Sequence, residues 1–155
     1  MSEVNRNVLQ ASTRPTRILL DDLEATRRSF APEVRANPGR ETFTLAVSVV
    51  RHFFGDQWYM DHVFQDAQGS RPDGFMRIDY TTGPVGESKT SRPLDFAENL
   101  FNLQHLDGFD DRVNQMRADS MIESTFAEFD FARFLYIHDI DFKFVEPLRR
   151  CRQGF

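Results

Sequence analysis

The hydrophobic residues of this chain change their spacing once, within residues 121–147. Up to Ile137 the apolar positions recur at the spacing of a helix. After position 139 they alternate with polar residues, and the alternating residues are Ile140, Phe142 and Phe144. A period near 3.6 is typical of a helix, and a period of two is typical of a strand with one buried face. The stretch therefore predicts a helix that leads directly into a strand.

The second half of this predicted helix is apolar on nearly every side, from Phe129 to Ile137. A helix that is hydrophobic all round must be covered on more than one side. One strand is a poor cover, because a strand without neighbours leaves its backbone N–H and C=O groups unpaired. We therefore expect the chain to stop inside a fold whose remaining strands it does not contain.

The rest of the hydrophobic pattern predicts a helical region over residues 15–118, after a disordered tail at 1–14. An irregular loop is expected at 66–93, with a candidate short strand at 75–80. Pro93 fits the first turn of a helix and Gly108 its end, whereas Asn37-Pro38-Gly39 is typical of a turn. Five apolar stripes at helical spacing are predicted, and Gly55 is the predicted C-terminal cap of the second. The stripes are Leu19, Leu23, Thr26 and Phe30; Phe43, Ala46, Val47, Val50 and Phe54; Phe96, Leu100 and Leu103; Val113 and Met116; and Ile122, Phe126 and Phe129. The fold class that follows is mainly α (α+β), a helical region with a terminal helix–strand unit at 119–147.

The segment FAEFDFARFLYIHDIDFKFVEP resembles the entry to the PD-(D/E)xK nuclease-like superfamily. In that superfamily a helix with one core-facing Glu leads into the first strand of a restriction-endonuclease-like α/β/α core. The resemblance covers residues 94–146 and assigns the helix acid to Glu128, which lies eleven positions before Asp139. It implies that Glu128 is a catalytic residue and a ligand of Mg²⁺ in a complete form that hydrolyses DNA phosphodiester bonds. The family's downstream Asp and E-x-K are absent, so the resemblance describes a truncated fragment without activity by itself.

A literal PD…ExK spacing occurs elsewhere, at Pro72-Asp73 and Glu87-Ser88-Lys89. The acid and the lysine of such a motif need a buried strand, whereas glycine and proline surround these residues. The motif also precedes the helix that it should follow. We interpret it as a coincidence.

The last eight residues, 148–155, form a basic tail with three arginines, LRRCRQGF. The family has a glycine-containing turn at this position. Codons can be chosen for the tail such that reading them one base later encodes a G-x-x-G-x-D pattern. This match suggests a frameshifted gene product. A natural basic tail is the alternative, and the nucleotide sequence of the coding region distinguishes the two.

Composition narrows the function classes. A net charge of −5 argues against a protein that coats nucleic acid by charge alone. The single Cys151 excludes an internal disulfide framework and a cysteine-rich zinc site, and the four histidines are scattered along the chain. We find no signal peptide and no apolar run of about 18 residues, so a cytoplasmic protein without a membrane segment is expected.

A second hypothesis comes from a different functional class. The chain would be a non-catalytic helical interaction protein with an exposed aromatic face around Phe134, Tyr136 and Phe144. Such a face would bind a partner or a second copy of the chain, which would make the protein a homo-oligomer. The sequence leaves both hypotheses open.

Overall fold

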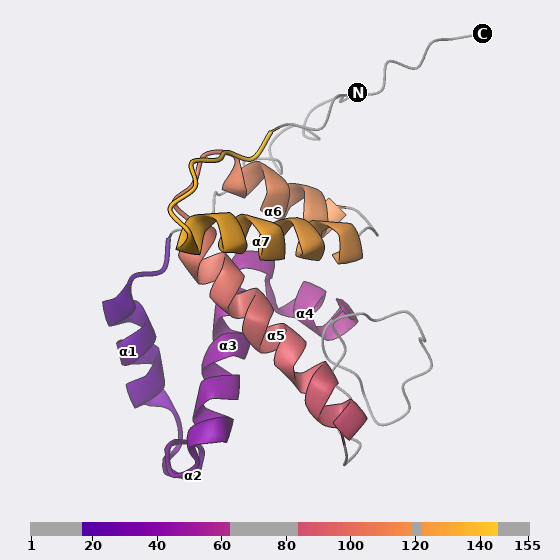
Figure 1. Cartoon of the computed structure of the whole chain (residues 1–155). Helices are drawn as coiled ribbons and strands as arrows, with labels where there is room; N and C mark the ends of the chain where they lie inside the picture. The colour runs from indigo at the N-terminus through magenta and orange to yellow at the C-terminus, as the bar shows by residue number, and fades with distance from the viewer. Residues whose placement is uncertain (1–16, 63–83, 119–121, 146–155) are drawn as a thin grey trace, which may run out of the picture.

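The computed structural model describes residues 17–62, 84–118 and 122–145, without the side chains of 84–91, 122 and 123. These residues are mainly helical, as Figure 1 shows. The helices are α1 (Leu20–Ser29), α2 (Pro32–Arg35), α3 (Pro38–Phe54), α4 (Asp56–His62), α5 (Pro84–Leu103), α6 (Phe109–Ala118) and α7 (Ile122–Ile137). The two tails and the candidate strand at 75–80 lie outside the described residues.

Helix α5 is the centre of the packing, with α3 on one side and α7 crossing its C-terminal end (Figure 1). The predicted stripe of Phe96, Leu100 and Leu103 is confirmed, since all three side chains are fully buried. The other large buried side chains come from α3, α6 and α7, and they are Phe53, Phe109, Met116 and Phe129. Each such side chain contributes about 1.5–3 kcal/mol by leaving water. Phenylalanine side chains from α3, α5, α6 and α7 therefore fill one core between the helices.

Helix α3 confirms the predicted stripe and corrects one predicted turn. Asn37, Pro38 and Gly39 begin the helix instead of forming a separate turn. The Asn37 side chain accepts a hydrogen bond from the backbone N–H of Arg40 (3.1 Å), and Pro38 occupies the first helical position. The predicted C-terminal cap is confirmed, because Gly55 follows the last turn with φ +85°.

Helix α5 begins nine residues before the predicted start, at Pro84, and Pro93 lies inside it. Proline is favoured in a first turn, and in a helix interior it removes one backbone hydrogen bond and crowds the carbonyl four residues earlier. Helix α5 nevertheless continues through Pro93. The helix also ends earlier than predicted, at Leu103. Gly108 instead precedes α6, with φ +82°.

Helix α1 lies at the surface and contains no buried residue. Its predicted stripe does not enter the core, although Leu23 packs against the core's edge. The buried residue is Ile18, just before the helix. Asp22 accepts a hydrogen bond from the N–H of Leu19 (2.8 Å), and this contact closes the first turn. Pro32 follows α1 after a short break and begins α2.

The strand predicted at 140–144 is not shown, since no described residue of that segment belongs to a sheet. Helix α7 ends in a Schellman motif: Asp139 has φ +53°, and the N–H of Ile140 donates to the carbonyl of Leu135 (3.0 Å). The extended segment then crosses the start of α6, where the N–H of Phe144 donates to the carbonyl of Asp107 (3.3 Å). Phe142 and Phe144 of this segment are partly buried against the helical core, whereas Ile140 is 48% exposed.

Candidate functional site

Helix α7 carries two apolar faces on opposite sides. The inner face packs on the core through Phe126, Phe129 and Ala132. The outer face carries residues at spacings of four, three and four, and we call these residues the outer seam: Ala127, Phe131, Phe134 and His138. Such spacing is that of the a and d positions along which one helix packs on another.

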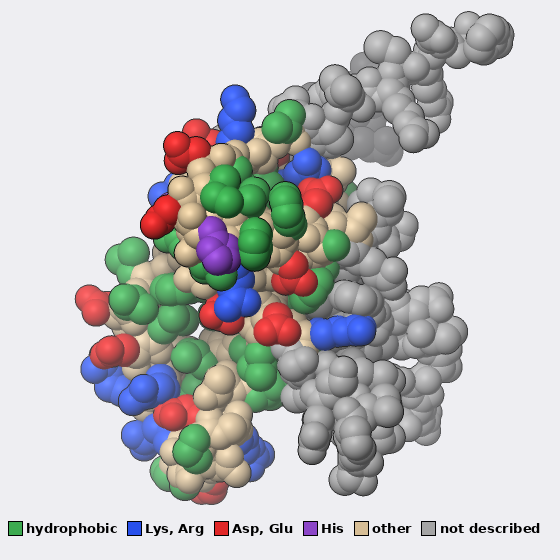
Figure 2. Space-filling view, in the orientation of Figure 1, with side chains coloured by type: hydrophobic (Ala, Val, Ile, Leu, Met, Phe, Trp, Pro, Cys, Tyr) green, Lys and Arg blue, Asp and Glu red, His purple; other side chains and the backbone are tan. Residues whose placement is uncertain are grey.

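The aromatic side chains of the outer seam contact one another and not the core. Phe131 is 62% exposed and Phe134 is 50% exposed. Their rings stack with centroids 6.4 Å apart and an interplanar angle of 15°. The Phe134 ring also lies 4.5 Å from that of His138. Figure 2 shows hydrophobic side chains gathered over α7 on the face toward the viewer.

Charged side chains beside the outer seam are already held by neighbouring helices. Glu128 of α7 forms an ion pair with Arg112 of α6 at 3.3 Å. On the other flank, Asp130 accepts a hydrogen bond of 2.6 Å from the side-chain amide of Asn99, which is fully buried. The flanks are therefore acidic and fixed, while the seam between them is apolar.

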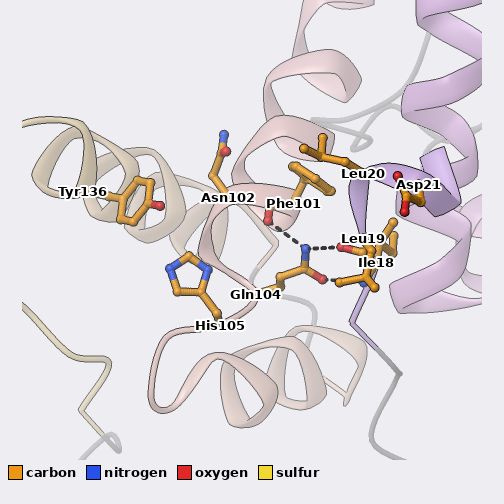
Figure 3. Close-up of a pocket in the computed structure, with 9 residues that line it drawn as sticks. All are labelled: Ile18, Leu19, Leu20, Asp21, Phe101, Asn102, Gln104, His105 and Tyr136. Atoms are coloured by element: carbon orange, nitrogen blue, oxygen red, sulfur yellow. Dashed lines mark hydrogen bonds between the residues drawn. The ribbon is translucent and has the colours of Figure 1, made fainter. Parts of the chain in front are cut away.

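A hollow of about 440 Å³ lies between α1, α5 and α7, and no residue of the outer seam lines it (Figure 3). Its walls are the start of α1, the end of α5 and Tyr136 of α7, whose ring lies 5.4 Å from that of His105. Gln104 holds the wall together: its side chain accepts from the N–H of Ile18 (2.7 Å) and donates to the carbonyl of the same residue (2.8 Å). The hydrogen bonds of Gln104 thus anchor the segment that precedes α1.

The sequence-predicted site residues do not gather in one place. Glu128 is half exposed and lies on the flank of α7, paired with Arg112, and not toward the core. Glu87 and Lys89 lie in α5, not in a loop or a strand. Asp73 and Cys151 are outside the described residues. Within residues 17–62, 84–118 and 122–145, no three His, Cys, Asp or Glu side chains are placed to hold a metal ion.

The predicted aromatic face is confirmed in part. Phe134 and Tyr136 are exposed, but Phe144 is half buried, with its ring 5.6 Å from that of Phe129. Phe131, which the sequence analysis did not single out, is the more exposed partner of Phe134. The signal that could have found it is the spacing of 127, 131, 134 and 138, which is legible in the sequence.

No protein-family model, curated protein or solved structure matches the chain. Among the helices that the structure describes, none is long and apolar enough to cross a membrane.

Proposed function

We propose that this chain is a helical interaction protein that binds an amphipathic helix of another chain along the outer seam of α7. The observation that carries the proposal is the stacked pair of Phe131 and Phe134, exposed on the face opposite the buried one. Two large aromatic side chains at this spacing are typical anchors of a helix-in-groove contact.

Energetic considerations support a functional role for the exposed pair. Burying a phenylalanine contributes about 1.5–3 kcal/mol relative to leaving it in water. The fold gains only part of this from Phe131 and Phe134, which are 62% and 50% exposed, and a docked helix would gain the remainder from both.

The test uses a designed helical peptide with leucine at its a and d positions and lysine beside them. Isothermal titration calorimetry is expected to show binding that Phe134→Glu weakens at least tenfold. Met60→Glu is the matched control, because Met60 has the same 50% exposure on α4. Equal affinity of the two variants, or no binding by the unmodified chain, would contradict the proposal.

The nuclease hypothesis concerns a complete form, with Mg²⁺ at Glu128 and DNA as substrate, and it stays a prediction. For Mg²⁺ to bind Glu128, the carboxylate would have to leave Arg112. In the docking proposal, the only role of Glu128 is its ion pair with Arg112. Glu128→Gln should therefore lower the unfolding free energy by less than about 1 kcal/mol. The same variant should leave peptide binding unchanged. The nuclease hypothesis instead requires that an extended product binds Mg²⁺ and loses it in this variant, which a Mg²⁺ titration measures.

A further inference from the structure

We infer that the helix bound by the outer seam is α7 of a second copy of this chain, packed antiparallel about a two-fold axis. The inference rests on the proposed function and names its partner. The first argument is that α7 is itself a helix of the required kind, with apolar residues at a and d spacing on its solvent face. A two-fold contact needs only one such surface, because each copy presents the same residues.

Antiparallel packing brings all four seam positions into register. With the axis between positions 132 and 133, Phe131 of one copy faces Phe134 of the other, and Ala127 faces His138. Each small side chain is therefore opposite a larger one, and the two phenylalanine pairs form the centre. A parallel arrangement would place Ala127 against Ala127 and His138 against His138, which leaves a gap at one end and crowding at the other.

The flanking charges favour the same orientation. Glu128 and Asp130 both lie N-terminal to the two-fold axis between positions 132 and 133 of α7. Antiparallel packing keeps the acidic halves of the two copies apart and places these acids near Leu135 and Ile137 of the other copy. Parallel packing would set the acids of both copies side by side, where like charges repel. The helix dipoles also oppose one another in the antiparallel arrangement.

The exposed area is of the right size for the centre of an interface. Phe131, Phe134 and Ile137 are 62%, 50% and 61% exposed. At roughly 200 Å² for a large side chain, they present on the order of 350 Å² of apolar surface. A stable interface covers about 800 Å² on each partner, with an apolar centre and a polar rim. These three side chains supply nearly half of that, and the polar flanks of α7 supply a rim.

Sedimentation equilibrium of the intact chain tests the inference. The unmodified chain and Met60→Glu are expected to form a reversible dimer, and Phe134→Glu and Phe131→Glu to weaken dimerisation at least tenfold with unchanged helical circular dichroism. A chain that stays monomeric up to about 1 mM overturns the second copy as partner, and so does a dimer that both glutamate variants leave intact. If such a monomer still binds the designed peptide, the proposed function stands and only this inference fails; if it does not, both fail.

Disulfide cross-linking tests the orientation. In a Cys151→Ser background, a mixture of Ala127→Cys and His138→Cys chains is expected to form a cross-linked heterodimer under mild oxidation, because these positions face each other. Neither variant alone is expected to cross-link. Efficient self-cross-linking of Ala127→Cys without the mixed product would overturn the antiparallel arrangement.

Discussion

Gly108 lies where the extended C-terminal segment crosses the start of α6. Two features of this position exclude a side chain. The backbone has φ +82°, and a Cβ atom would lie 2.8 Å from both the Cβ and the carbonyl oxygen of Phe144. In Gly108→Ala, Phe144 must therefore move away from α6.

The cost has two separable parts. A left-handed backbone costs a residue other than glycine about 1–2 kcal/mol. Displacing Phe144 loses its ring contact with Phe129, about 0.5–1.5 kcal/mol, and its backbone hydrogen bond to Asp107, also about 0.5–1.5 kcal/mol. Gly108→Ala should lower the unfolding free energy by about 2–5 kcal/mol.

Two other glycines provide matched controls for the two parts. Gly55 has φ +85°, but a Cβ atom at this position would meet no other atom within 4 Å. Gly55→Ala should therefore cost only the backbone part, which is about 1–3 kcal/mol for the conformation of Gly55 (φ +85°, ψ 164°). Gly39 lies in α3, and its Cβ would meet only the Asn37 side chain at an ordinary 3.5 Å. Gly39→Ala should be neutral or stabilise the fold by less than about 1 kcal/mol.

The assay is urea unfolding followed by far-ultraviolet circular dichroism and by the fluorescence of Trp58, the single tryptophan. The expected order of stability is Gly39→Ala, then Gly55→Ala, then Gly108→Ala. Phe144→Ala should cost little more in the Gly108→Ala background, because the contact is already lost. A Gly108→Ala variant as stable as Gly55→Ala would refute the placement of Phe144 on α6.

Three further predictions concern single side chains. Gln104→Leu should destabilise the fold by about 1–3 kcal/mol and speed hydrogen exchange of the Ile18 amide, because it leaves the backbone groups of Ile18 without their partner; unchanged exchange would contradict this. Asp139→Gly should stabilise the fold by about 1 kcal/mol in urea unfolding, because Asp139 holds the left-handed position of the Schellman motif; a loss of stability would count against that cap. Partial desolvation, and then the charge of Asp130, raise the pKa of Asp95 above its ordinary 3.8, although the residue is exposed. Folding therefore favours protonated Asp95, and this stabilisation is present at low pH and lost as the pH rises through the raised pKa. Asp95→Asn should accordingly melt higher than the unmodified chain at pH 7, and the difference should shrink below pH 3.8; a difference that grows on acidification would reverse the assignment.

The sequence predicted best where a local pattern and the buried face coincide. The stripes of α3 and α5 follow helical spacing, and their residues are buried as that spacing implies. The same argument failed for α1, because whether a stripe is covered depends on neighbours that the pattern does not contain. Pro93 shifted the expected start of α5, since a preference for the first turn does not forbid the interior.

The surroundings of the candidate site were harder to predict, because the contacts that hold its flanks and the nearby hollow are long-range. The alternation after Asp139 predicted a strand that the described residues do not show: Phe142 and Phe144 pack on the helical core, but Ile140 is 48% exposed. Glu128 pairs with Arg112, and Gln104 binds Ile18 at a separation of 86 residues, and neither pair has a sequence signature. The seam spacing was present in the sequence, but only the fold shows which face of α7 is left to solvent.

The most direct test of the docking account is carbene footprinting of the intact chain at low and high protein concentration. Labelling of Phe131 and Phe134 is expected to fall as the chain is concentrated. Labelling of Met60, which lies on α4 and has the same exposed fraction as Phe134, is expected to stay constant. Adding the designed helical peptide at low concentration should protect the same two phenylalanines. Labelling of Phe131 and Phe134 that stays level with that of Met60 under all of these conditions would contradict the claim that α7 binds a helix.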